Sequence, residues 1–395
     1  MGRTTELIAG LVLALVGLVF AAAALEVGVR VLHLEPDRFW EPDPLLGTRH
    51  IPGKSGWWTQ EDREFVVPVQ INEQGWRDVP RAVEKPAGAT RILVLGDSFS
   101  EAMQVPVEQS FPRRLEEELN KGSKRPVEVV NTGISGFGTA GELLLLRRDG
   151  ARYAPDVVLL AFFPGNDVMN NSPTLEKTLI PAYGPDGAVQ KVVSADPQRQ
   201  PRGFFSKLLA RSKAYQYARR RLVTGHPDLA RRLGLGNAEK TALAGDGIPP
   251  GYLVYAPPDA AWQEAWSHTE TLIDATNAQA KAMGSRLAVA VVSSREEVYP
   301  EWWDEARQTY PAMQGRTWDV DAPRRRIVEL CKARGIPVLE LAPVLRAQRG
   351  GEPLHFHRDG HWTAAGHRIA AESMANFLVK EGLLTKDTEG DHEVH

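Results

Sequence analysis

Four short polar segments of the chain each follow an apolar run that has the pattern of a buried strand. They contain Ser98, the glycine-rich stretch 131–138, Asn166, and the pair Asp359 and His361. Because the carboxyl ends of parallel strands meet at one edge of a sheet, we expect these segments to converge there. A serine hydroxyl becomes a good nucleophile when a histidine, oriented by a carboxylate, takes its proton. These residue types therefore indicate acyl transfer through a serine.

The same chemistry needs hydrogen-bond donors for the oxyanion of the tetrahedral intermediate, each lowering the barrier by on the order of 3 kcal/mol. The candidate donors are the backbone N–H groups of Ser98 and Gly136 and the side-chain amide of Asn166. Neighbouring carboxylates have simpler predicted roles. Asp97 and Asp167 are expected to fix turns by bonding to local backbone, while Glu142, in the helical pattern after the glycine-rich stretch, is expected to be solvated.

Together, these segments resemble the sequence blocks of the SGNH hydrolases, the GDSL-type esterases and lipases. Gly-Asp-Ser at 96–98, Asn-x-Gly-x-Ser-Gly at 131–136, Gly-Asn-Asp at 165–167 and Asp-x-His at 359–361 carry the resemblance. It implies a catalytic triad and an oxyanion hole, and neither a cofactor nor a metal. The triad consists of Ser98 as nucleophile, His361 as base and Asp359 as acid, and the oxyanion hole of Ser98, Gly136 and Asn166.

The final block departs from the commonest family pattern, which has two residues between acid and base. Here only Gly360 intervenes. The shorter spacing resembles a membrane-anchored or periplasmic branch that includes polysaccharide O-acetyl-transfer relatives. His355, His357 and His367 are alternative bases. We expect His367 to lie inside the last helix, and the other two to be loop residues rather than metal ligands.

The fold class follows from the alternation of strand and helix patterns. Such repeated units predict a flavodoxin-like, three-layer α/β/α fold around a mostly parallel five-stranded sheet. Helical patterns cover 111–119, 140–149, 322–334 and 364–380, the last one capped by Thr363. Cys331 lies in one of them and is expected to be a packing residue. The five predicted strands are 91–95, 127–131, 155–162, 287–292 and 336–341.

The amino-terminal region contains an uncharged apolar run from Leu7 to Leu25. As a helix it is about 28 Å long, close to the thickness of a bilayer core. The weakly positive flank favours a retained anchor over a cleaved signal peptide, with the folded domain on the outer face of the membrane. Residues 26–88 are expected to form a lead-in packed on the main domain, which spans 89–385, and residues 386–395 a disordered tail.

Residues 171–251 are interpreted as a helical insertion into the main domain. Between Arg199 and Arg232 the sequence is strongly basic, with Asp228 as its single acid. The basic stretch is either a solvated lid helix or a segment that binds an anionic membrane surface or an acidic polymer. The whole chain of 395 residues has a net charge of −3, which argues against a general nucleic-acid-binding protein.

These observations favour a membrane-anchored serine esterase acting on O-acyl esters of cell-envelope carbohydrate or lipid. A polysaccharide O-acetyltransferase using the same acyl-enzyme is an open alternative, because the sequence does not determine whether water or a sugar hydroxyl reaches the intermediate. A membrane-tethered binding or assembly protein that has kept the fold without activity is a third interpretation. This third interpretation is less favoured because every catalytic position has a residue that can do the chemistry.

Overall fold

The computed structural model describes residues 2–60, 62–121, 123, 125–194, 209, 211–233 and 247–384. The chain divides into two compact units. The first comprises residues 1–38, 57–66 and 198–242, and the second comprises 39–56, 67–197 and 243–395. The predicted tail and much of the predicted insertion, including 199–208, lie outside the described residues.

The second unit is built on a five-stranded parallel sheet with the order β11-β10-β7-β5-β6. The middle strands are almost entirely apolar, because both of their faces are covered. In β5 the side chains alternate between two separate core clusters, with Leu93 and Leu95 on one face and Ile92 and Val94 on the other. The strands are β5 (Thr90–Gly96), β6 (Val127–Asn131), β7 (Val157–Phe162), β10 (Arg286–Val291) and β11 (Val338–Glu340).

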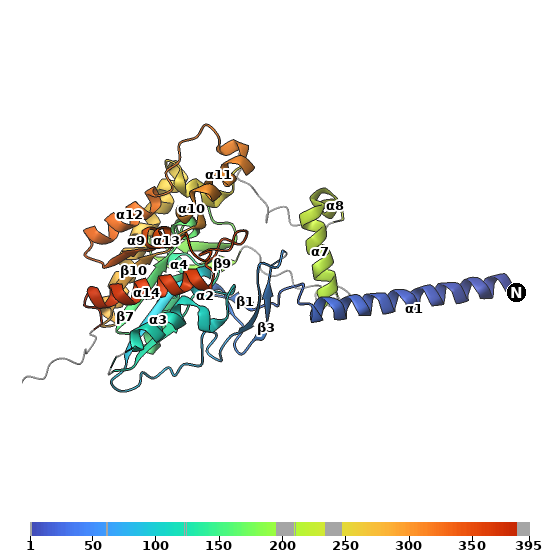
Figure 1. Cartoon of the computed structure of the whole chain (residues 1–395), viewed down its shortest axis with the longest axis horizontal. Coiled ribbons are helices and arrows are strands. Elements are labelled where there is room, and N and C mark those ends of the chain that lie inside the picture. Colours follow the sequence, from blue (N-terminus) through green and yellow to red (C-terminus); the bar gives the residue numbers. More distant parts are fainter. Residues whose placement is uncertain are drawn as a thin grey trace, which may run out of the picture. The chain divides into compact units, whose positions relative to one another are not determined.

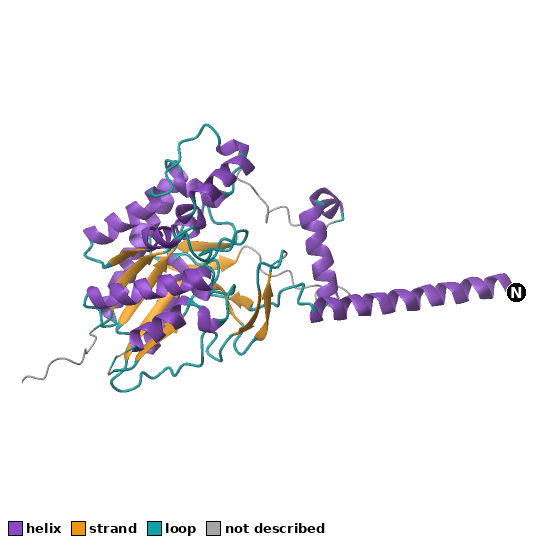
Figure 2. Cartoon of the chain, viewed as in Figure 1, coloured by secondary structure: helices purple, strands orange, loops and turns teal. Residues whose placement is uncertain are grey.

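Helices cover both faces of this sheet (Figures 1 and 2), so the predicted three-layer α/β/α fold is confirmed. On one face the core includes α4 (Thr139–Arg148), α9 (Ala260–Ala282) and α12 (Ala322–Ala333), which contains the buried Cys331. On the other face it includes α3 (Phe111–Asn120), α13 (Leu341–Gln348) and α14 (Ala364–Lys380), and Thr363 caps the last of these as predicted.

Short elements complete the second unit. Hairpin β1–β2 (Trp40–Asp43 and Gly47–His50) and hairpin β8–β9 (Leu179–Tyr183 and Val189–Ser194) are both antiparallel. Within the predicted insertion, residues 179–194 thus form a hairpin, whereas Lys213–Gly225 and Pro227–Arg232 are helical as predicted. The short helices are α2 (Ser98–Glu101), α5 (Pro164–Asn170), α10 (Arg295–Val298), α11 (Pro300–Thr309) and the 3-10 turns η1 (Val107–Gln109), η2 (Gly150–Tyr153), η3 (Pro250–Tyr255) and η4 (Pro311–Met313).

The first unit contains α1 (Gly2–Val31), α7 (Lys213–Gly225) and α8 (Pro227–Arg232). Helix α1 is apolar all round, and its stretch Thr4–Val31 is long and apolar enough to cross a membrane. Its length and composition are those of a membrane anchor or of a signal sequence. Strands β3 (Ser55–Thr59) and β4 (Val66–Gln70) form a further two-stranded sheet.

Candidate active site

Ser98 is the first residue of α2, directly beyond the carboxyl end of β5. Asp97 occupies the N-cap position and accepts a hydrogen bond from the backbone N–H of Phe99 at 2.9 Å, which is the local turn-fixing role predicted for it. The backbone of Ser98 thus continues from a buried strand into a capped turn. This arrangement holds the half-buried hydroxyl at the edge of the sheet.

His361 and Asp359 lie in the loop that precedes α14, and the structure brings both to Ser98. The Nε2 atom of His361 is 2.7 Å from Ser98 Oγ, and its Nδ1 atom is 2.6 Å from the Asp359 carboxylate. Gly360 has a φ of +88°, a conformation that costs glycine little. The resulting tight turn lets an acid and a base separated by one residue contact each other, which accounts for the short Asp-x-His spacing.

Opposing effects act on the pKa of the His361 imidazole. Partial burial favours its neutral form, but the hydrogen bond and charge of Asp359 outweigh burial, so the pKa of His361 is raised. Asp97 and Glu101 add to the rise. A histidine whose pKa is raised from its usual value towards neutral pH can take and return a proton there.

The other histidines are less suited to act as the base. Burial lowers the pKa of His355 and of His367 to about 3. His367 lies in α14 as predicted, where it packs on Phe111 and Trp362. His357 is exposed and lies 3.2 Å from Glu305. Of the four histidines in this region, His361 is the one hydrogen-bonded to Ser98.

Asn166 is held in the first turn of α5, after β7. Its side-chain Nδ2 donates to the Asp97 carboxylate at 2.9 Å. An amide nitrogen carries two hydrogens, so this bond orients the group and leaves a second N–H available. Asp167 accepts from the backbone N–H of Phe163 at 2.8 Å, which confirms its predicted role in the turn.

The glycine-rich loop after β6 lies close to α2. A side chain at Gly133 would place its Cβ 2.5 Å from Cβ of Ser100, so the absence of a side chain permits this contact. The backbone N–H of Ile134 donates to the Gly96 carbonyl at 3.1 Å, which ties the loop to the end of β5. Gly136 has a φ of +80°, and its carbonyl accepts from Asn170 at 3.0 Å.

A group of three buried carboxyls lies beside these residues. The expectation that Glu142 is solvated is wrong: its side chain is buried in the first turn of α4, and neither carboxylate oxygen has a hydrogen-bond partner among the described residues. Burial, followed by the charge of Asp97, raises the pKa of Glu142 well above its usual value. Burial also raises the pKa of Asp97 to about 6, and it raises the pKa of Asp167 well above its usual value.

Replacing Glu142 by glutamine is expected to flatten the dependence of stability on pH. In the unfolded chain Glu142 ionises near its usual pKa of 4.5, while the folded chain keeps the proton to a higher pH. The stabilisation is therefore complete below that value and is lost as pH rises towards the folded pKa, with a slope of about 1.4 kcal/mol per pH unit for one proton. Urea unfolding at a series of pH values measures the slope. Glu372→Gln, on the exposed side of α14, is the control, and equal slopes for the two variants would contradict the assignment.

Sequence reasoning missed the role of Glu101, which is buried at the end of α2. Its carboxylate accepts from Trp40 Nε1 at 2.8 Å, lies 2.5 Å from His50 Nε2, and accepts from the hydroxyl of Ser135. These contacts join the hairpin β1–β2 to the loop that contains Gly136. A glutamate three residues after a candidate nucleophile is no signal by itself, because its partners come from distant segments.

Glu101→Gln tests this connection. Charge-assisted hydrogen bonds contribute about 1.5–3 kcal/mol each, so we expect the free energy of unfolding to fall by about 2 kcal/mol. Loss of the negative charge should also lower the pKa of His361 and move the acid limb of the pH–rate profile to lower pH. Glu117→Gln, on the exposed face of α3, should change neither quantity. A Glu101→Gln profile that matches the wild-type curve would be inconsistent with this electrostatic link.

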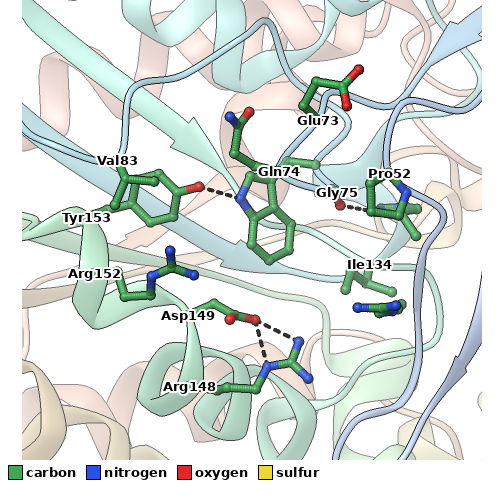
Figure 3. A pocket seen from close by; sticks show the side chains of 13 residues that line it. Pro52, Glu73, Gln74, Gly75, Val83, Ile134, Arg148, Asp149, Arg152 and Tyr153 are labelled. Carbon is green, nitrogen blue, oxygen red and sulfur yellow. Dashed lines mark hydrogen bonds and ion pairs between the residues drawn. The ribbon is translucent and has the colours of Figure 1, made fainter.

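A cavity of about 600 Å³ is lined in part by the β1–β2 hairpin and by the loop after β6 (Figure 3). His50 and Ile134 form part of its wall, and Trp76 donates from Nε1 to the Tyr153 hydroxyl at 2.8 Å beside it. Its rim carries Arg49, Arg148, Arg152, Glu73 and Asp149. Ser98 and His361 do not line the cavity, so it is separate from the candidate active site.

Comparison with known families finds a match in the carboxyl-terminal part of the chain. Residues 255–393 match the family model described as SGNH hydrolase-like domain, acetyltransferase AlgX. Over this stretch the chain is similar to an SGNH hydrolase-like domain, and the resemblance drawn from its motifs is confirmed. The matched stretch contains Asp359 and His361, while Ser98 lies upstream of it.

Individual relatives are similar over shorter stretches. An arylesterase of Vibrio mimicus is 39% identical over 70 residues, 18% of this chain and 34% of that protein. The probable alginate O-acetylase AlgJ of Pseudomonas fluorescens is 28% identical over 108 residues, 27% of this chain and 26% of that protein. The chain thus matches about a third and a quarter of the lengths of these relatives. The crystal structure of TesA gives a TM-score of 0.39 at 15% identity, over 75% of this chain and 100% of TesA.

Proposed function

We propose that this protein is a serine acyl-transfer enzyme that cleaves O-acyl esters through a covalent acyl-serine. The observation that carries the proposal is the continuous hydrogen-bonded chain from Asp359 through His361 to Ser98, at 2.6 and 2.7 Å. These are the distances and the order that a nucleophile, a base and an orienting acid require. Four segments far apart in the sequence contribute to this site, and each follows a strand of the same sheet.

In the proposed reaction His361 Nε2 takes the proton of Ser98 as Oγ attacks the ester carbonyl. Asp359 holds the opposite nitrogen, Nδ1, in its protonated form and stabilises the imidazolium. Collapse of the tetrahedral intermediate breaks the bond to the alcohol, which leaves with the proton from His361. Water or a second hydroxyl then attacks the acyl-serine by the same steps in reverse, and Ser98 recovers its proton.

The oxyanion of the intermediate is assigned to three donors: the backbone N–H groups of Ser98 and Gly136 and the second N–H of Asn166. The bond from Asn166 to Asp97 supports this assignment, because it fixes the plane of the amide before substrate binds. Preorganised donors of this kind are worth more than mobile ones, since they need no rearrangement during the reaction.

For the substrate we favour an O-acetyl ester of a cell-envelope carbohydrate over a lipid ester. The match to the AlgX family model and the stretch similar to AlgJ support a carbohydrate. Those same similarities support the alternative that the acyl group passes to a sugar hydroxyl instead of water. An inactive binding protein is the least favoured interpretation. Helix α1 is proposed to be a retained anchor that keeps the domain at the outer face of the membrane.

The test uses the full chain in detergent, with an aryl acetate as acyl donor and a fluorophosphonate probe for an activated serine. We expect release of the aryl alcohol and labelling of Ser98. Adding an oligosaccharide then separates the two reactions: acetylated sugar indicates transfer, whereas an unchanged yield of free acetate indicates hydrolysis. Absence of both labelling and ester cleavage would refute the proposal and favour a binding protein.

A further inference from the structure

Exposed large apolar side chains are concentrated in the first unit. Outside α1 and the residue that follows it, the described residues contain four such side chains, and three of them belong to this unit: Leu209, Leu229 and Leu233, each 45–57% exposed. The fourth, Val193, lies in β9 of the second unit. Exposed apolar patches rimmed by polar residues mark surfaces that contact a partner or a membrane.

Helix α7 is attached to α1 at the end of the apolar run. Glu26 directly follows that run, and its carboxylate accepts from Ser212 Oγ at 2.7 Å and from the backbone N–H of Ala214 at 2.9 Å. A side chain of α1 thus binds the first turn of α7. If α1 spans a bilayer, Glu26 emerges at its surface, and α7 begins at that level.

Two further contacts fix the direction of α7. Lys213 lies 3.0 Å from the Asp37 carboxylate, and Arg220 lies 2.9 Å from that of Glu35, both in the segment after α1. Because these contacts are seven residues apart on α7, they hold the helix against this segment along about two turns. Figure 1 shows that α7 runs across the end of α1 instead of continuing along it.

The charge of this region is strongly positive. Between residues 211 and 233 there are seven arginines and lysines and one acid, Asp228. Lys213 and Arg220, which contact Asp37 and Glu35, are two of the seven. Basic residues that lie next to a membrane span are attracted to anionic headgroups, and exposed leucines beside them can enter the acyl boundary.

We propose that α7 and α8 bind anionic phospholipid headgroups at the surface of the membrane that α1 spans. The arginines of α7 supply the electrostatic attraction, and Leu229 and Leu233 enter the interface. This inference depends on α1 being retained in the membrane and does not depend on chemistry at Ser98.

The experiment places an environment-sensitive fluorophore on the full chain as Leu229→Cys. The native Cys331 is fully buried, so the chain without this substitution serves as the labelling blank. The chain is reconstituted in nanodiscs of phosphatidylcholine alone or mixed with phosphatidylglycerol. We expect a blue-shifted emission that is quenched by brominated lipid in the mixed discs, and at most half of that effect in phosphatidylcholine alone.

Charge-reversal variants test whether the arginines of α7 cause the shift in emission. The double variant Arg219→Glu with Arg221→Glu should lose the shift in mixed discs, while Arg147→Glu with Arg152→Glu, which reverses two exposed arginines of the second unit, should keep it. Circular dichroism verifies that each variant is folded. Any one of three results overturns the proposal. These are a water-like emission in both lipids, equal emission in both lipids, and loss of the shift in the control pair. A shift that depends on chain concentration in detergent would instead indicate a second copy of the chain, and also overturns it.

Discussion

Ser98→Ala is expected to lower kcat for ester cleavage by about 10⁴- to 10⁶-fold without unfolding the protein. The substitution removes the single oxygen that His361 Nε2 contacts at 2.7 Å, so no acyl-enzyme can form. The turn that begins α2 is capped by the Asp97 side chain, so α2 does not need the hydroxyl of Ser98 as a cap. The thermal midpoint should therefore remain close to that of the wild type. Steady-state kinetics and fluorophosphonate labelling give the two readouts.

The matched control is Ser373→Ala in α14, whose hydroxyl bonds to a carbonyl of its own helix. This variant should retain full activity and full labelling. If Ser98→Ala kept more than about one-hundredth of the wild-type rate, a loss smaller than removal of a catalytic serine causes, Ser98 would not be the nucleophile. If Ser98→Ala lost both activity and helicity, the more conservative Ser98→Thr would replace it in the test. That variant should fold and should remain unlabelled.

Asp359→Asn has the second-largest expected effect, a fall in kcat of about 10⁴-fold. The amide can donate to His361 Nδ1 and thereby favour the wrong tautomer, which puts the proton on the nitrogen that faces Ser98. It also removes the charge that raises the pKa of His361, so the residual activity should reach its plateau at lower pH than in the wild type. The base acts in its neutral form, so wild-type activity should increase as pH rises through the raised pKa of His361.

A pH–rate profile of kcat/KM checks both parts of this prediction. Asp304→Asn, an exposed aspartate on α11, is the control and should reproduce the wild-type profile. A profile for Asp359→Asn with an unmoved acid limb would mean that another group sets the pKa of His361. An unchanged kcat would mean that a different carboxylate orients the base.

The sequence allowed the sheet and the site to be predicted for a shared reason. Strands buried on both faces appear as apolar runs, and in a parallel sheet their carboxyl ends meet at one edge, so residues after each run are brought together whatever their separation in sequence. Ser98 and His361 are 263 residues apart and are in contact for this reason. Helix α9 was missed although its buried residues recur at helical spacing, and two of them, Thr269 and Thr276, are polar.

The surroundings of the site could not be predicted because they depend on packing between distant segments. A glutamate in the first turn of a helix is typically solvated, but Glu142 is buried because α4 packs against β5 and α5, the elements that position Asp97 and Asp167. Likewise, the partners of Glu101 come from the hairpin β1–β2 and from Ser135. The sequence pattern around a residue does not indicate which distant residues its side chain will contact.

The tight turn at Gly360 has a mechanical consequence. Since proton acceptor and orienting acid occupy a single turn, a rigid displacement of that loop preserves their mutual alignment and changes only the gap to the nucleophile. Such a displacement would interrupt the hydrogen bond from His361 to Ser98 and would leave the bond to Asp359, and with it the tautomer, unaltered.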